Sequence, residues 1–421
     1  MNDASAARKP WTVLAYTVAD DPDHPLDHWA EKELKALCDA ADFGAVSIAV
    51  QVDFDTPKGV FRGSLTTAPP ESRGFEDIRA EDHVLWKSIL GEVDAKRSLL
   101  RVQMERRDLG AARANVLQQF LRFGQRECPA ERYVVFFYGH ASGPFGLFND
   151  RATGARKFDT LRLNDLAGSL ETTDDRASVV VFRDCFMNTL ETAYQLRDTA
   201  EFMIASQAIA PVGGVWPWHR FMATLAPGAD SADVGLGIVK RLADFLDEDP
   251  AHRDGCAAVP YSLLDLSAAD ACTAPLAALV AALDAARADP ARSRACAAAL
   301  ETARVGSTTN RQIPGDPALL DVPTMCAGLA ALSGDPVAAP ARAFGDVVGS
   351  RLVRWHHSQT TFHKGTSLFY KPVRKRDLKL TYIHAEDETV AAEDAAYYQR
   401  LALSTTTGWD RIALNPFPVT D

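Results

Sequence analysis

A histidine and a cysteine follow two apolar stretches of the chain. The stretch YVVFFY ends at Tyr138, two residues before His140, and the stretch SVVVF ends at Phe182, three residues before Cys185. A thiol becomes a strong nucleophile when a neighbouring base takes its proton. These two residue types therefore fit nucleophilic catalysis with an acid–base partner.

The elements that would position this pair are strands of one sheet. Strand-like runs cover residues 11–19, 45–54, 133–138, 178–182 and 202–205, and helical spacing is found at 26–41, 115–123 and from 190 onward. Apolar strands alternating with helices predict an α/β fold with a mainly parallel sheet flanked by helices. Ligands of such sheets bind beyond the carboxyl ends of the strands, so we expect His140 and Cys185 at the functional edge.

The second half of the chain has more helical patterning than the first. Residues 259–266 and 366–370 resemble strands, 269–303 and 319–332 have helical spacing, and 56–77 read as an exposed loop. No low-complexity linker separates the halves. We expect a core at residues 11–267, a C-terminal helical subdomain or insertion at 268–345, and a final part, 346–421, that completes the core.

Charge and cysteine content restrict the partners. The formal net charge is -11, which argues against nucleic acid, because phosphate binding needs clustered Lys and Arg. The seven cysteines form no C-x-x-C pair, so neither a metal site nor a disulfide framework is expected. We expect no membrane-spanning run, and a cytoplasmic protein unless an upstream segment precedes Met1.

The residues alone leave two interpretations of His140 and Cys185 open. A single histidine or cysteine at a strand end is more often structural than catalytic. Placement of both on successive strand ends favours a catalytic pair, but spacing does not decide between the two.

The sequence around both residues resembles a known family. YVVFFYGHASG resembles the strand and His-Gly motif of clan CD cysteine peptidases, and VVVFRDCFMNTLETAYQLRDTAEFMIAS resembles the strand, catalytic cysteine, turn and helix of the clostripain family. PVGGVWPW is similar to that family's Pro-Gly-x-Gly-Trp stretch. The resemblance implies a caspase-like fold and cleavage of protein or peptide substrates by a His140–Cys185 dyad. It implies no redox or nucleotide cofactor, while calcium, which some relatives use, stays open.

Several other residues are candidates for the substrate site. The backbone N–H groups of Ala141 and Cys185 are expected to stabilise an oxyanion, although the family usually has glycine at the position of Ala141. Ser206 and Gln207 end the following strand and could line the P1 pocket. Trp216 could form a wall of the cleft, with an ordinary core tryptophan as the alternative.

Arg183 is the main departure from the family pattern. The resemblance places an acidic residue two positions before the cysteine, in the pocket that selects a basic P1 residue. Residues i and i+2 of a strand face the same side, so Arg183 would face the substrate and favour an acidic P1 residue, Asp or Glu. The alternative is that Arg183 turns outward or pairs with a neighbouring carboxylate, while Asp184 reaches the pocket and keeps the specificity basic.

The resemblance also suggests activation by self-cleavage in the stretch after the histidine. Asp150, Arg156 and Lys157 are the candidate cleavage sites there. The altered residues beside the dyad leave open a catalytically weak, caspase-like scaffold that binds a partner protein. A regulatory protein partner therefore stays open too.

Overall fold

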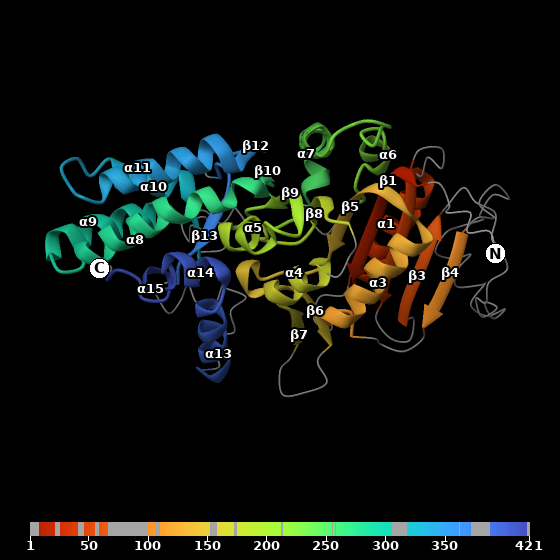
Figure 1. Cartoon of the computed structure of the whole chain (residues 1–421), viewed down its shortest axis with the longest axis horizontal. Coiled ribbons are helices and arrows are strands. Elements are labelled where there is room, and N and C mark those ends of the chain that lie inside the picture. Colours follow the sequence, from red (N-terminus) through yellow and green to blue (C-terminus); the bar gives the residue numbers. More distant parts are fainter. Residues whose placement is uncertain are drawn as a thin grey trace. The chain divides into compact units, whose positions relative to one another are not determined.

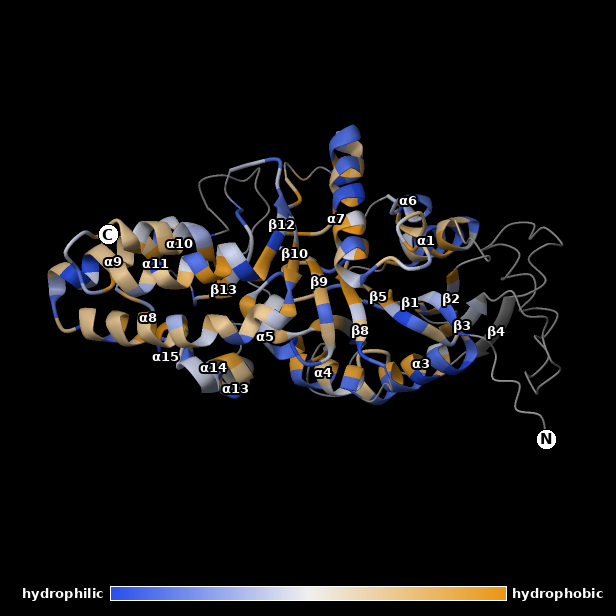
Figure 2. Ribbon diagram, turned by 45° about the horizontal axis from the view of Figure 1, so that its top comes forward, coloured by the Kyte–Doolittle hydropathy of each residue, from blue (hydrophilic) through white to orange (hydrophobic). Residues whose placement is uncertain are grey.

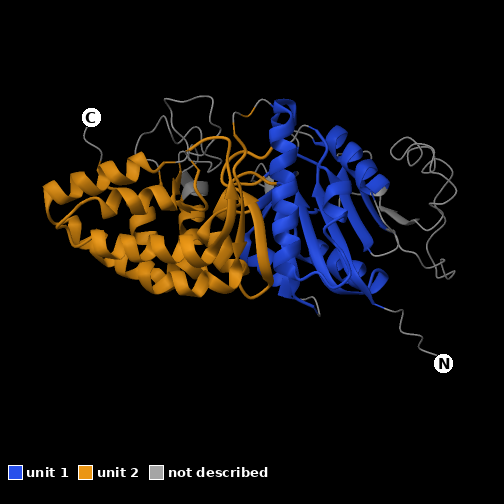
Figure 3. Cartoon of the chain, turned by 90° about the horizontal axis from the view of Figure 1, so that it is seen from above, with its two compact units in different colours: residues 1–140, 147–183, 212–254 blue, residues 141–146, 184–211, 255–421 orange. Residues whose placement is uncertain are grey.

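The structure is a computed structural model, which describes residues 8–21, 26–40, 46–54, 59–65, 100–105, 110–151, 158–171, 175–211, 214–254, 256, 258–304, 318–361, 363–371 and 388–418. The chain divides into two compact units (Figure 3). Unit 1 comprises residues 1–140, 147–183 and 212–254, and unit 2 comprises residues 141–146, 184–211 and 255–421.

Unit 1 contains a sheet whose strands run in the order β8-β5-β1-β2-β3-β4 (Figure 1). Their bounds are β1 (Lys9–Val18), β2 (Val46–Phe54), β3 (Gly59–Leu65), β4 (Leu100–Glu105), β5 (Ala130–Tyr138) and β8 (Ala177–Phe182). The pairs β1–β2, β1–β5 and β5–β8 are parallel, whereas β3 and β4 continue the sheet with antiparallel pairing. Every residue of β2 and β8 is buried, as expected for strands covered on both faces.

Helices cover both faces of this sheet. Figure 2 shows α1 (Asp27–Ala40), α6 (Trp218–Met222) and α7 (Ser231–Glu248) on one face, and α3 (Ala114–Glu127) and α4 (Leu163–Glu171) on the other. Helix α3 buries an apolar stripe at helical spacing that includes Val116, Leu117, Phe120 and Leu121. A separate pair of strands, β6 (Leu147–Arg151) and β7 (Phe158–Leu161), follows His140 in the chain.

Unit 2 has its own strands and most of the C-terminal helices. Its strands β9 (Ala200–Ser206), β10 (Tyr261–Asp265) and β12 (Val353–His357) run antiparallel in the order β12-β10-β9, and β11 (Leu319–Asp321) pairs with β13 (Ser367–Phe369). The helices are α5 (Leu190–Leu196), α8 (Thr273–Ala286), α9 (Pro290–Thr302), α10 (Val322–Ala330), α11 (Ala338–Val347), α13 (Glu388–Gln399), α14 (Ala402–Thr407) and α15 (Asp410–Ala413). Two 3₁₀ helices, η2 (Gly143–Phe145) and η4 (Leu266–Cys272), and a π-helix, η5 (Val348–Leu352), also belong to this unit.

One helical stretch is long and apolar enough, by length and composition, to cross a membrane. It runs over Leu266–Ala286, and 39% of its most apolar window is buried. The expectation that no apolar run reaches this length was therefore wrong for this stretch. Core helices of globular proteins pass the same test, so the finding is weak evidence for a membrane segment.

The predicted fold class is confirmed: the protein is α/β, with a mainly parallel sheet flanked by helices and a group of C-terminal helices. The seven predicted strands are present, but the expected loop at 56–77 contains β3, and the first residues of the expected helix at 319–332 form β11. The expected boundaries at 267 and 345 stay a prediction. The four helices α8, α9, α10 and α11 lie within unit 2.

Gly124 allows α3 to approach the sheet closely. A Cβ atom at this position would overlap Cδ2 of Leu14 and lie 3.3 Å from Cβ of Ala49. Gly168, in the middle of α4, has open space instead, with nothing within 4 Å of an added Cβ. Close packing against the sheet therefore explains the glycine at position 124, whereas the packing leaves room for a side chain at position 168.

We predict that Gly124→Ala lowers the free energy of unfolding by about 1–3 kcal/mol, because α3 must move away from Leu14. Gly168→Ala is the matched control and should raise it by up to about 1 kcal/mol, since alanine is the better helix former. Urea unfolding of both variants measures the difference. Equal effects of the two substitutions would contradict the close approach at Gly124.

Candidate active site

The pairing of β5 with β8 fixes the points at which the chain leaves the sheet before His140 and before Cys185. The last paired residues of these parallel strands are Phe137 and Phe182, and His140 and Cys185 each follow that pair by three residues. Parallel strands run in the same direction, so both residues leave the sheet at its carboxyl edge.

The backbone at His140 is closely packed. A Cβ atom at Gly139 would lie 2.8 Å from Cδ1 of Phe148 and 3.1 Å from the carbonyl oxygen of Val18. The carbonyl oxygen of His140 accepts a hydrogen bond from the N–H of Phe148 at 2.6 Å, and the His140 side chain is half-buried. Because Gly139 has no side chain, the backbone just after β5 can pack closely against Phe148 and Val18.

Cys185 lies in a turn rather than in a continued strand. The N–H of Arg183 donates to Phe137 at 2.8 Å, after which the chain turns, and Phe186 has a φ angle of 61°. The rule that residues i and i+2 of a strand face the same side therefore does not apply to Arg183 and Cys185. A positive φ at a residue other than glycine is uncommon and marks a constrained turn.

The thiol of Cys185 is buried and protonated. Cys185 is 6% exposed, and its Sγ donates to the carbonyl oxygen of Ala210 at 3.9 Å. Burial raises the pKa of Cys185 to about 12, and the charge of Asp184 acts in the same direction. In this state the thiolate is a minor species near neutral pH.

The segments that follow His140 and Cys185 touch one another. Gly143, three residues after His140, has a φ of 57°, and a Cβ atom there would lie 3.2 Å from the carbonyl oxygen of Phe186 and 3.6 Å from its Cβ. Glycine is favoured here both by its conformation and by the lack of space. Within unit 2, this contact joins the segment that follows His140 to the turn that contains Cys185.

Asn188 anchors the turn that contains Cys185. Its N–H donates to Ser206 at 3.0 Å, its side chain donates to the carbonyl oxygen of Gly365 at 2.8 Å, and its own carbonyl oxygen accepts from the N–H of Ser367 at 3.1 Å. The turn is thus held both by the end of β9 and by residues nearly 180 positions later.

Ser206 and Gln207, predicted to bind substrate, are fully buried. The Gln207 amide donates to Asp321 at 3.1 Å and to Ser367 at 3.0 Å and accepts from the N–H of Gly365 at 3.0 Å, while Oγ of Ser206 accepts from the N–H of Ala208 at 3.1 Å. All of these bonds hold the protein together. A substrate-binding role for either residue stays a prediction.

Glu191 on α5 and Tyr398 on the C-terminal helix α13 support the same region. Oε1 of Glu191, on α5, accepts from the Tyr398 hydroxyl at 2.6 Å and from the N–H of Phe369 at 2.8 Å. Burial raises the pKa of Glu191. The Tyr398 ring stacks on Phe145, with ring centroids 5.8 Å apart, and Phe145 lies five residues after His140. Tyr398 therefore contacts segments that follow both candidate catalytic residues.

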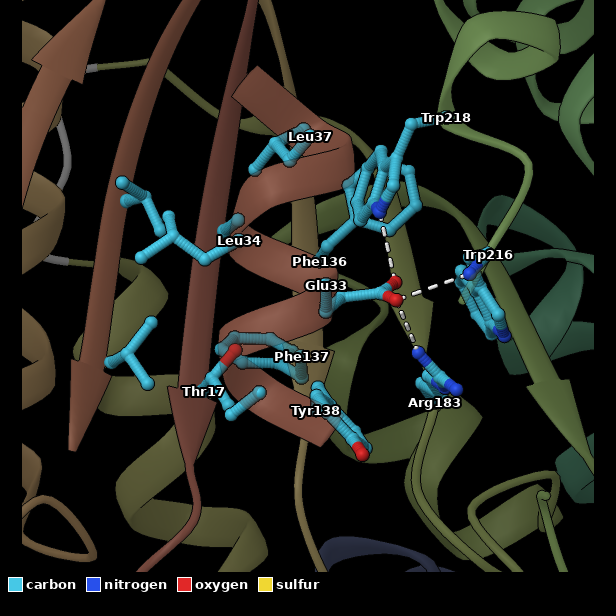
Figure 4. A pocket seen from close by; sticks show the side chains of 14 residues that line it. Thr17, Glu33, Leu34, Leu37, Phe136, Phe137, Tyr138, Arg183, Trp216 and Trp218 are labelled. Atoms are coloured by element: carbon cyan, nitrogen blue, oxygen red, sulfur yellow. Dashed lines mark hydrogen bonds and ion pairs between the residues drawn. The ribbon is translucent and has the colours of Figure 1, made fainter. Parts of the chain in front are cut away.

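Arg183 lies in a buried polar cluster of unit 1 (Figure 4). Its Nη1 is 2.8 Å from Oε2 of Glu33 on α1, and its Nη2 donates to the carbonyl oxygen of Gly214 at 3.1 Å. The guanidinium lies over the rings of Tyr138 and Trp216, at 4.5 Å and 5.4 Å from their centroids. Only 3% of Arg183 is exposed.

Trp216 forms part of this cluster. Its N–H donates to Oε2 of Glu33 at 3.1 Å, and Nε1 of Trp218 donates to Oε1 of Glu33 at 2.8 Å. Both indoles pack against Phe136, with ring centroids 6.2 Å and 4.6 Å away. Trp216 is 5% exposed, as a core tryptophan would be, and its role in substrate binding stays a prediction.

A small cavity remains beside the cluster, between α1 and the sheet. Its volume is about 20 Å³, which is room for a water molecule. Apolar side chains of α1, β1, β2 and β5 line it, with Thr17, Glu33, Tyr138 and Arg183 as its polar members.

The remaining predicted residues are placed as follows. Ala141 is buried, and its oxyanion role stays a prediction. Asp150 is buried in β6, where its Oδ2 accepts from the N–H of Ala112 at 3.0 Å, so cleavage after it would require this strand to open. Arg156 and Lys157 lie outside the described residues.

Among the residues that are described, no three His, Cys, Asp or Glu side chains form a group that could hold a metal ion.

Three residues that the sequence analysis did not select carry much of this geometry: Glu33, Asn188 and Glu191. A signal existed for Glu33, because the helical stripe of Leu26, Ala30 and Leu37 passes through position 33 and places a carboxylate on the apolar face. No local pattern indicated the partners of Asn188 and Glu191, which lie far away in the sequence.

The family of the chain is shown by its sequence. The model of the clostripain family, Peptidase_C11, matches residues 16–312, which is more than half of the chain. The fold and this match define a cysteine endopeptidase, a hydrolase, and the chain belongs to the clostripain family. No curated protein matches it.

Solved structures share the fold over nearly the whole chain. A secreted C11 cysteine protease from Bacteroides thetaiotaomicron, in complex with an irreversible peptide inhibitor, is 13% identical with a TM-score of 0.62, over 95% of this chain and 99% of that one. An inactive zymogen C11 protease from Parabacteroides distasonis is 16% identical with a TM-score of 0.56, over 95% and 98%. A further structure of a secreted Bacteroides thetaiotaomicron protease, iotapain, is 14% identical with a TM-score of 0.60, over 95% and 99%.

We predict slow alkylation of Cys185 in the resting protein, because its thiol is protonated. The rate of modification by iodoacetamide at Cys185 should rise about tenfold per pH unit up to about pH 10, following the thiolate fraction. Mass spectrometry of the Cys185 peptide measures the rate, and the Cys185→Ala variant controls for the other cysteines. A rate that levels off below pH 8 would show that the thiol is already activated.

We predict that Tyr398→Phe lowers the free energy of unfolding by about 1–3 kcal/mol, because it removes a hydroxyl that donates to a buried carboxylate. Tyr194→Phe is the matched control, since its hydroxyl makes only a 3.4 Å contact with Thr406. Urea unfolding measures both. If the two variants lost the same stability, the Tyr398 bond to Glu191 would not be the cause.

Proposed function

We propose that the protein cleaves polypeptides with Cys185 as nucleophile and His140 as acid–base partner. The single observation that carries this assignment is the contact between Gly143 and Phe186, which joins the segments following the two residues. The equal offset of His140 and Cys185 from the last β5–β8 pair supports it.

The protonated thiol determines what His140 has to do. Cys185 attacks the scissile carbonyl carbon, and as the S–C bond forms the thiol proton passes to the His140 imidazole. The imidazolium then protonates the amine as the C–N bond breaks, which leaves a thioester on Cys185. His140 next takes a proton from water, the hydroxide attacks the thioester, and Cys185 regains its proton as the acid product leaves.

Backbone donors would stabilise the oxyanion of both steps. The candidates are the N–H groups of Ala141, which directly follows His140, and of Cys185, the proposed nucleophile itself. Thiol and imidazole chemistry requires no redox or nucleotide cofactor, so we propose none. Calcium binding stays open, and we assign no residues to it. We propose a cytoplasmic location; the two Bacteroides structures are described as secreted, which makes export the alternative.

For the P1 residue we propose a preference for Asp or Glu over Arg or Lys. Arg183, two residues before Cys185 in the chain, places a positive charge where the resemblance places a negative one. One observation favours the basic alternative: the carboxylate of Glu33 lies 2.8 Å from the same guanidinium.

A second candidate function is a weakly catalytic scaffold that binds a regulatory protein partner. The buried, protonated state of Cys185 favours it, because a resting thiol of this kind reacts slowly. The two functions differ in whether substrate-like electrophiles react selectively at Cys185.

We predict that fluorogenic peptides differing only at P1 are cleaved fastest after Asp or Glu. Substituting Cys185→Ala or His140→Ala should reduce turnover by about a thousandfold or more, as expected when nucleophile or base is lost. Initial rates with Asp, Glu, Asn, Arg and Lys at P1 measure both effects. Turnover of only the Arg and Lys peptides would contradict the proposed acidic P1 preference. Selective turnover that survives Cys185→Ala would contradict the proposed catalytic dyad.

A further inference from the structure

Residues 206–210 of unit 2 lie directly against the turn that contains Cys185. Three of their carbonyl oxygens accept hydrogen bonds from this turn: Ser206 from the N–H of Asn188 at 3.0 Å, Ala208 from the N–H of Phe186 at 3.1 Å, and Ala210 from Sγ of Cys185 at 3.9 Å. The position of this segment therefore determines what surrounds the thiol.

The side chain of Gln207 ties this segment to distant residues of unit 2. It is fully buried, and its Nε2 donates to Oδ1 of Asp321 at 3.1 Å and to Oγ of Ser367 at 3.0 Å. Its Oε1 accepts from the N–H of Gly365 at 3.0 Å. Both ends of the amide are thus in use, and a movement of Gln207 would take these bonds from buried polar groups.

Gly365 and Ser367 also hold the turn from another side. The carbonyl oxygen of Gly365 accepts from Nδ2 of Asn188 at 2.8 Å, and the N–H of Ser367 donates to the carbonyl oxygen of Asn188 at 3.1 Å. The bonds therefore form a closed ring that runs from the turn through Gly365 and Ser367 to Gln207, and through residues 206–210 back to the turn. In this ring the Gln207 amide joins the two supports of the turn to one another.

We propose that Gln207 is a positioning residue for Cys185, which holds residues 206–210 so that the thiol stays in the place from which it attacks the substrate. The effect on turnover rests on the proposed peptidase function, whereas the effect on the thiol itself does not. Gln207 acts through Ala208 and Ala210, which follow it closely in the chain and contact the turn.

The first test is Gln207→Met, which nearly keeps the length of the side chain and removes the amide. Residues 206–210 then lose their tie, and kcat should fall by about tenfold to a hundredfold with KM within about threefold, because a small displacement of a reacting group lowers the rate of the chemical step. Alkylation of Cys185 by iodoacetamide near neutral pH should rise by about tenfold, since burial is the main cause of the raised pKa of this thiol.

Thr324→Val is the matched control. Oγ1 of Thr324 donates to Oδ2 of Asp321 at 2.6 Å, so this variant also loses a buried hydrogen bond to Asp321, but at the oxygen that Gln207 does not contact. Both kcat and the alkylation rate of Cys185 should stay at the wild-type values. Urea unfolding of the two variants shows whether their losses of stability are comparable.

Gln207→Glu separates positioning from a general loss of stability, and it carries the test if Gln207→Met fails to fold. When ionised, the introduced carboxylate repels Asp321. When protonated, its hydroxyl can donate to Asp321 as the amide does, and the N–H of Gly365 keeps an acceptor. A neighbouring carboxylate and burial both raise the pKa of the introduced group. Its kcat relative to wild type should therefore recover by about tenfold as the pH falls from about 8 to about 6, under conditions in which both proteins are fully folded.

The outcomes that contradict the inference differ from those that contradict the function. If folded Gln207→Met and Gln207→Glu match Thr324→Val in kcat and in alkylation of Cys185 at every pH, Gln207 does not position Cys185 and the peptidase remains. If the wild-type chain cleaves no peptide with any P1 residue while Gln207→Met still raises the alkylation rate above that of Thr324→Val, the proposed function fails and the positioning of the thiol stands.

Discussion

The parallel pairing of β5 with β8 is the constraint on which the arrangement around His140 and Cys185 depends. Its register joins Val134 to Val179 and Phe137 to Phe182. Because side chains alternate along a strand, a slip of one residue would turn every core side chain of β8 to the other face. All six β8 residues are buried, so such a slip would disrupt the close packing on both faces of the strand, and the same register sets where the chain leaves the sheet before Arg183 and Cys185.

Beyond the sheet, the position of Cys185 depends on segments that are distant in the sequence. The turn is tied to Gly365 and Ser367 through Asn188, and α5 is tied to Tyr398 through Glu191. These buried hydrogen bonds matter because each would leave a desolvated polar atom if its partner moved. The local sequence around Cys185 specifies the turn, whereas residues 363–371 and 388–418 hold it in place.

The strands that end next to His140 and Cys185 could be predicted because their signals are local, whereas the catalytic role of the two residues stays a prediction. YVVFFY and SVVVF are apolar, have strand length and end next to His140 and Cys185. β3 was missed because it begins at Gly59 and its apolar residues are interrupted by Gly63, and glycine is depleted in strands. The ion pair of Arg183 was considered without a named partner, since Glu33 lies 150 positions earlier and only the folded chain brings the two together.

The pair of Glu33 and Arg183 also makes each residue depend on the other. Loss of Glu33 would take from the buried Arg183 the counter-charge that lies 2.8 Å away, and loss of Arg183 would leave the Glu33 carboxylate with its two N–H donors from Trp216 and Trp218. Removing one partner of a buried ion pair generally costs more stability than replacing both by uncharged residues of similar volume, so the two positions are coupled in what they tolerate.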